Sequence, residues 1–161
     1  MSDSEKRHWV FRAHVIDRAG ALTSIASVFS NEGINIGTVV GHGIVEQANV
    51  EGSVVLTFFC SEKQKDIMVR KIRRLSKVLA LEERPYDSRS LRKSVIMYTR
   101  RKLKPKDVAG ENAFLTCELV NSDDEGFTYF LAGSPGELDP VLMRLEKSKL
   151  VVDMVYSIVG I

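Results

Sequence analysis

The chain has 161 residues, a net charge of +2, 44% hydrophobic and 27% charged residues, proportions typical of a soluble globular protein with a buried core. A charge so close to zero does not by itself indicate a polyanionic partner, and no apolar run reaches the length of a membrane-spanning helix. The polar start, M-S-D-S-E-K-R-H, has no apolar signal-peptide region, so we expect a cytoplasmic protein.

The first half of the sequence predicts the element order βαββαβ. The run W-V-F-R-A-H-V-I alternates as a half-buried strand does. Leu22, Ile25, Ala26 and Phe29 recur at a spacing that lines one face of a helix, and Gly33 is a natural left-handed end for it. We expect a loose tail over 1–7, strands over 9–16, 34–40, 53–60 and 78–83, a glycine-rich loop over 41–52, and a second helix opened by a capping box of Ser61 and Gln64.

The second half repeats this pattern after a polar, turn-rich linker over 85–93. It predicts strands over 94–100, 113–120, 127–132 and 150–159, and a helix with a second capping box at Ser134 and Glu137. Pro105 leaves room for only about one turn of helix between the first two of these strands. The sequence therefore predicts an α+β fold with two tandem ferredoxin-like βαββαβ domains, over 8–84 and 94–161, the second with a shortened first helix.

The turn before the first helix has the chemistry to hold a free amino acid. Gly20 lacks a Cβ, so a ligand can approach the first unpaired amides of the helix, which suit a carboxylate. Asp17 and Asn35 add an anionic oxygen and a side-chain amide for an ammonium group. On residue chemistry alone, a plain helix cap and turn is the favoured reading of Asp17 and Gly20.

The motifs D-x-A-G-A-L and N-E-G-I-N-I, with F-L-A-G-S-P-G-E-L-D near the C-terminus, resemble the ACT-domain family, and within it the regulatory (small) subunit of acetolactate synthase. In that family two chains enclose a feedback-inhibiting branched-chain amino acid such as valine. The resemblance implies a non-catalytic homodimer without cofactor or metal, acting on a thiamine-diphosphate-dependent catalytic (large) subunit. The effector-binding residues it implies are Asp17, Gly20, Ala21, Leu22, Asn35 and Ile36.

No catalytic motif accompanies these residues. His14 and His42 have no nucleophile or metal ligand at a recognisable spacing. Cys60 and Cys117 each lie in a strand-like apolar run, so we expect buried, reduced thiols. An enzyme of acylphosphatase type shares the fold class, but the sequence has no phosphate-cradling loop with the required arginine.

Two further interpretations remain open. One is a freestanding ACT-type amino-acid sensor that regulates a different enzyme. The other is a nucleic-acid-binding module, because basic residues cluster over 63–77 and over 100–106. The aromatic-rich RNP1 pattern of RNA-binding sheets is missing from the strands, so a solvated basic face is favoured. The cluster over 100–106 could instead dock on an acidic surface of a partner enzyme.

Overall fold

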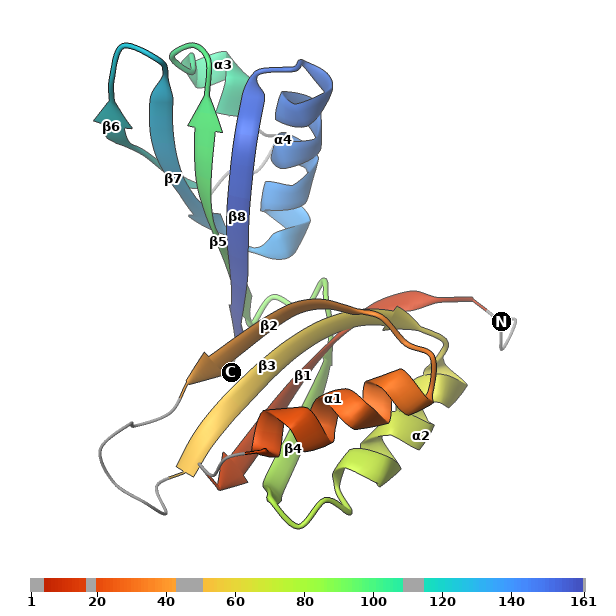
Figure 1. The fold of residues 1–161 in the computed structure, drawn as a ribbon. Coiled ribbons are helices and arrows are strands. Elements are labelled where there is room, and N and C mark those ends of the chain that lie inside the picture. Colours follow the sequence, from red (N-terminus) through yellow and green to blue (C-terminus); the bar gives the residue numbers. More distant parts are fainter. Residues whose placement is uncertain (1–4, 17–19, 43–50, 109–114, 161) are drawn as a thin grey trace. The chain divides into compact units, whose positions relative to one another are not determined.

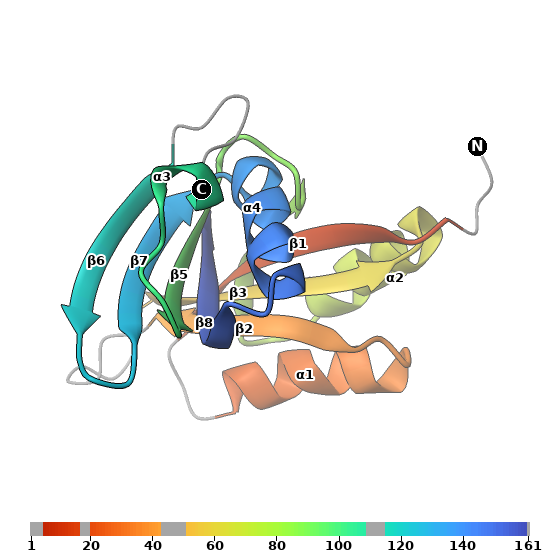
Figure 2. The same cartoon turned by 90° about the horizontal axis from the view of Figure 1, so that it is seen from above.

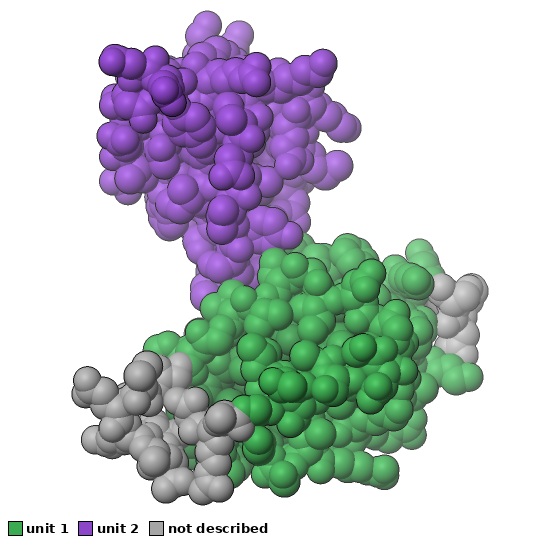
Figure 3. Space-filling view, in the orientation of Figure 1, with its two compact units in different colours: residues 1–86 green, residues 87–161 purple. Residues whose placement is uncertain are grey.

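The computed structural model describes residues 5–16, 20–42, 51–108 and 115–160. The chain forms two compact units, residues 1–86 and residues 87–161 (Figure 3). The first contains β1 (Arg7–Ile16), α1 (Ala21–Asn31), β2 (Ile36–His42), β3 (Glu51–Cys60), α2 (Glu62–Ile72) and β4 (Val78–Pro85). The second contains β5 (Leu91–Thr99), α3 (Pro105–Val108), β6 (Thr116–Ser122), β7 (Phe127–Gly133), α4 (Pro135–Lys147) and β8 (Val151–Gly160).

Each unit has a four-stranded antiparallel sheet with its helices on one face (Figures 1 and 2). The strand orders are β2-β3-β1-β4 and β6-β7-β5-β8, so both units have the same topology. The tandem ferredoxin-like fold expected from the sequence is confirmed, and α3 has only four residues. Because β2 and β4 lie at the ends of the first sheet, each has one edge without a partner strand in the described part of the chain.

The core of the first unit lies between its sheet and the two helices. Phe58 contacts Phe11 and Phe29 edge to face, with ring centroids 4.6 and 4.9 Å apart, an arrangement that aromatic pairs favour. The buried face of α1 is formed by Ala21, Ile25, Val28 and Phe29.

Leu22 was predicted to belong to the buried face of α1, but 45% of it is exposed. Both Leu22 and Ala21 fit the three- and four-residue spacing, and the structure turns Ala21 inward instead. Gly33 has the left-handed conformation expected at the end of this helix, with φ of 64°.

Three other expectations are corrected. Cys117 is exposed, because β6 is an edge strand whose seven residues are all exposed. Ser61 and Gln64 form the reciprocal capping box, whereas the Ser134 hydroxyl donates to Glu137 Oε2 at 2.6 Å and caps no amide. The predicted linker ends early, because Leu91 is buried and begins β5.

A buried lysine joins helix to sheet in both units. In the first unit, Lys65 Nζ of α2 lies 3.0 Å from Asp66 and 2.9 Å from Glu83, and 4.8 Å from the ring centroid of Trp9. In the second unit, Lys93 Nζ of β5 lies 2.7 Å from Asp139 Oδ1 of α4 and 4.0 Å from the ring centroid of Tyr156. Each ammonium is thus held by a carboxylate and an aromatic face.

The two clusters occupy equivalent places with their members exchanged. The spacing that aligns Ser61 with Ser134 also aligns Asp66 with Asp139 and Glu83 with Tyr156. Phe11 of β1 lies opposite Glu83 of β4, and Val95 of β5 lies opposite Tyr156 of β8. Trp9 and Lys93 each lie two residues before these positions, so they occupy equivalent places on β1 and β5. The lysine lies on the helix in one unit and on the strand in the other.

The second cluster predicts an asymmetric response to mutation. Asp139→Asn leaves the Lys93 ammonium buried without a counter-charge, and we expect it to lower the free energy of unfolding by about 3 kcal/mol. Lys93→Met leaves Asp139, whose side chain is 34% exposed and can be hydrated, so we expect a loss of about 1 kcal/mol. Urea unfolding followed by circular dichroism measures both, and a larger loss for Lys93→Met would contradict this explanation.

Candidate functional site

Among the described residues, no side chain caps the start of helix α1. Gly20 occupies the N-cap position in the left-handed conformation, with φ of 86° and ψ of 3°. Its carbonyl accepts the first helical bond, from the Ser24 amide at 2.9 Å. In the described part of the chain, no group accepts a hydrogen bond from the amides of Ala21, Leu22 and Thr23. Such amides at a helix start form a site for an anion.

The ammonium group of Lys77 lies beside this helix start. A Cβ placed on Gly20 would be 2.9 Å from Lys77 Nζ, so only glycine allows this approach without displacing the lysine. The Lys77 carbonyl also accepts a hydrogen bond of 3.0 Å from the Ile16 amide, which fixes the lysine backbone next to the end of β1. An ammonium group beside unpaired amides favours a carboxylate. The sequence did not identify Lys77, because only the tertiary structure brings it to this turn.

The other predicted residues lie at the far end of α1. This helix has 11 residues and is therefore about 16 Å long, and Asn35 and Ile36 follow its C-terminal end. Asn35 is exposed and Ile36 is half-buried. One chain therefore does not bring Asn35 together with Gly20. Asp17, the remaining predicted residue, lies outside the described residues.

Asn35 and Ile36 line a hollow of about 300 Å³. Its other lining residues are Lys6, Gly33, Ile34, Gly37, Phe59 and Gln64. Gln64 accepts a hydrogen bond from the Ser61 amide at 3.1 Å, which leaves its own N–H groups for another acceptor, and no described residue is hydrogen-bonded to the Asn35 side chain. The hollow combines side-chain amides, one cation and an apolar wall, which suits binding rather than covalent chemistry.

His14 and His42 do not line this hollow. His14 Nε2 is 2.7 Å from Glu82 Oε1, and this hydrogen bond lowers the pKa of Glu82. His42 ends β2 and is exposed. Among the residues that the structure describes, no three His, Cys, Asp or Glu side chains are grouped to hold a metal ion, and no helix is long and apolar enough to cross a membrane.

Comparison with known proteins identifies the fold. No protein-family model and no curated protein matches the sequence. Among solved structures, the chain is similar to the acetolactate synthase small subunit from Thermotoga maritima, with 17% identity, a TM-score of 0.72 and 96% of each chain covered. It is less similar to the regulatory subunit of aspartate kinase from Thermus thermophilus, with 11% identity, a TM-score of 0.48, and 91% of this chain and 98% of the other covered. A third structure is the ACT domain of GTP pyrophosphokinase from Chlorobium tepidum, with 21% identity, a TM-score of 0.42, and 50% of this chain and all of the other covered.

The first of these likenesses extends over both units. The chain therefore has the same tandem ferredoxin-like fold as that structure, as its sequence predicted. At 17% identity the likeness establishes the fold, and the two matches with lower TM-scores add nothing further.

Two glycines of α1 offer a matched test of the Lys77 contact. Gly20 and Gly33 both have positive φ, so alanine at either position should lower the free energy of unfolding by about 1 kcal/mol. A Cβ on Gly33 meets nothing within 4 Å, whereas on Gly20 it meets the flexible end of Lys77. We expect similar losses for Gly20→Ala and Gly33→Ala in urea unfolding. A much larger loss for Gly20→Ala would mean that Lys77 is locked in place.

Proposed function

We propose that this chain is a non-catalytic regulatory subunit of the acetolactate synthase type, which binds a branched-chain amino acid such as valine between two copies of its first unit. The observation that carries the proposal is the separation of two complementary half-sites by α1. One half-site consists of the α1 start with Lys77, and the other of Asn35, Ile36 and the hollow that they line. A second copy is needed to bring the two halves together.

Edge strand β2 suggests how the copies pair. In both views β2 ends on the side of the unit where α1 begins (Figures 1 and 2). Two β2 strands paired antiparallel about a twofold axis would form one continuous sheet. The start of each β2, with Asn35, would then lie beside the end of the other β2 and near the start of the other α1. Such a homodimer has two identical sites.

The half-sites divide the chemistry of an amino acid between them. The unpaired amides of Ala21 and Leu22, with the Lys77 ammonium, take the carboxylate. The Asn35 carbonyl oxygen accepts from the ammonium, and Asp17 adds a negative charge. Leu22 and Ile36 of opposite chains form the apolar wall for an aliphatic side chain. Because Leu22 is 45% exposed in the single chain, contact with ligand would bury apolar surface.

Regulation follows because ligand binding and dimer geometry are thermodynamically linked. A ligand that contacts both chains binds most tightly to one dimer geometry and shifts the population toward it. A catalytic subunit that prefers one geometry is then activated or inhibited by the ligand. The proposed partner is the thiamine-diphosphate-dependent large subunit, and the proposal is supported by the likeness to an acetolactate synthase small subunit over 96% of both chains.

A complementation experiment tests the shared site. Calorimetric titration of the wild type with valine, leucine and isoleucine should show binding of at least one. Leu22→Asp places a negative charge at the carboxylate end, and Asn35→Ala removes the ammonium acceptor, so each should weaken binding about tenfold or more. Ser27→Asp, on an exposed position of the same helix, is the control and should bind as the wild type does.

Mixed dimers decide whether the site lies between chains. A dimer of one Leu22→Asp chain and one Asn35→Ala chain keeps one intact site, so the mixed dimer purified after co-expression should show wild-type affinity at half the stoichiometry. If the mixture binds no better than either variant alone, the site is not shared in this way. If no amino acid binds the wild type at millimolar concentration, the sensor function itself is wrong.

The short helix α3 favours a second candidate, a freestanding ACT-type sensor of a different enzyme. This helix has four residues, whereas the resemblance to acetolactate synthase small subunits implies a longer one. Mixing the chain with an acetolactate synthase large subunit distinguishes the two. The first candidate predicts a complex in gel filtration whose activity depends on the amino acid. The second predicts no complex, with amino-acid binding retained.

A further inference from the structure

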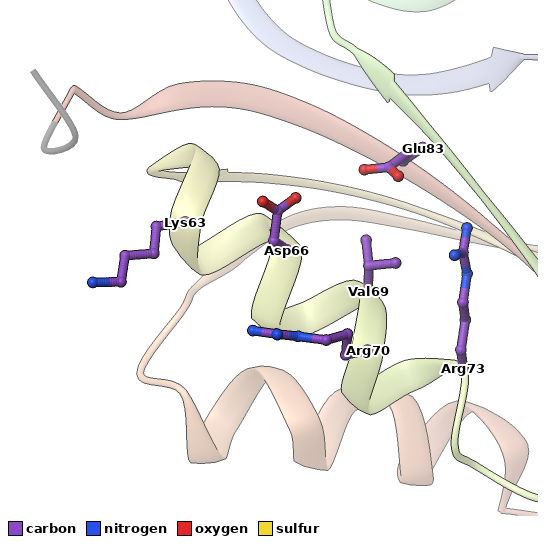
Figure 4. A pocket seen from close by; sticks show the side chains of 6 residues that line it. All are labelled: Lys63, Asp66, Val69, Arg70, Arg73 and Glu83. Carbon is purple, nitrogen blue, oxygen red and sulfur yellow. The ribbon is translucent and has the colours of Figure 1, made fainter. Parts of the chain in front are cut away.

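A second hollow lies between α2 and the edge strand β4, and we call it the α2 groove (Figure 4). It has a volume of about 390 Å³ and is lined by Lys63, Asp66, Val69, Arg70, Arg73 and Glu83. Lys63, Asp66, Val69 and Arg70 lie on one face of α2 at helical spacing, and Arg73 follows at its C-terminal cap. The groove shares no lining residue with the hollow at Asn35.

The carboxylates of the α2 groove are already paired. Asp66 and Glu83 both bind the Lys65 ammonium, at 3.0 and 2.9 Å, and Figure 4 shows Asp66 turned toward the Glu83 strand. Arg73 Nη2 donates to the Leu81 carbonyl at 3.3 Å. In the described part of the chain, neither Lys63 nor Arg70 has a carboxylate within salt-bridge distance. Figure 4 shows Arg70 lying across α2 and Lys63 pointing away from the other lining residues.

The balance of charge in the α2 groove is therefore positive. Lys63, Arg70 and Arg73 contribute three cations, and Lys65 offsets one of the two carboxylates. The Leu81 carbonyl that Arg73 meets belongs to β4, the last strand of the sheet. An edge strand therefore lies beside the cations, a combination that suits an extended peptide carrying negative charge.

We propose that the α2 groove docks an acidic peptide segment of a partner protein, with glutamate or aspartate side chains bound by Lys63, Arg70 and Arg73. Guanidinium groups bind carboxylates in bidentate fashion, and Val69 supplies an apolar contact at the centre of the groove. Nucleic acid fits less well, because no aromatic ring lines the groove for base stacking. This docking does not require the amino-acid site of the preceding section.

Fluorescence anisotropy of the full chain with a labelled oligoglutamate peptide at low salt tests the proposal. The peptide should bind, and Arg70→Glu should weaken binding about tenfold, the effect of losing one charge-assisted hydrogen-bonded contact. Arg74→Glu makes the same charge change at an exposed position of the next turn, outside the groove, and should change affinity by about twofold at most. Circular dichroism should be unchanged, because the Arg70 side chain has no described partner.

Three results would overturn the proposal. The first is equal weakening by Arg70→Glu and Arg74→Glu, which would indicate a general charge effect. The second is no peptide binding by the wild type at low salt. The third is tighter binding of an RNA oligonucleotide than of oligoglutamate, lost in Arg70→Glu, which would assign the groove to nucleic acid. The valine titration of Arg70→Glu is a separate readout, so failure of either proposal is visible without the other.

Discussion

Helix α1 keeps apart the two groups of polar atoms that the first unit offers to an amino acid. Its N-terminal end carries the amides next to Gly20, which have no acceptor among the described residues, and the nearby Lys77 ammonium. Its other end leads to Asn35 and Ile36. Since a zwitterion of amino-acid size cannot span a helix of about 16 Å, one chain alone offers only halves of a site. The proposed pairing through edge strand β2 would join the halves and make ligand binding depend on the dimer. Such a dependence would allow a small binding module to act as a regulator.

The same sheet-and-helix unit occurs twice. In both copies a lysine, a carboxylate and an aromatic ring join helix to sheet, but the lysine and the ring lie on different elements in the two copies. Lys65 on α2 meets the Trp9 ring and two carboxylates, whereas Lys93 on β5 meets Asp139 and the Tyr156 ring. In both units a cation between a carboxylate and an aromatic ring fixes the second helix to the sheet. In the first unit this lysine also neutralises part of the acidic charge of the α2 groove, so the structural cluster and the proposed docking surface are linked.

The sequence predicted the element order, the duplication, the first capping box and the short α3, because each depends on local periodicity or local chemistry. It misplaced Leu22 because Ala21 fits the same helical spacing, and only packing against the sheet decides which residue is buried. It misplaced Cys117 because an apolar run does not reveal that its strand lies at an edge. Lys77 was missed for a similar reason, since its position beside Gly20 arises from β4 returning next to β1. Local sequence patterns thus predicted the secondary structure and its order. The positions of the candidate site residues depend on contacts between segments far apart in the sequence.

The central claim is that the α1 start of one chain meets the β2 start of another around a bound amino acid. Methyl-to-methyl nuclear Overhauser effects between Leu22 and Ile36, measured with valine in mixed dimers of labelled and unlabelled chains, test it most directly. Because α1 separates these residues within one chain, any such effect must arise between chains. We expect this intermolecular signal, with its intensity rising as valine is added. Its absence in a valine-saturated sample would contradict the shared site.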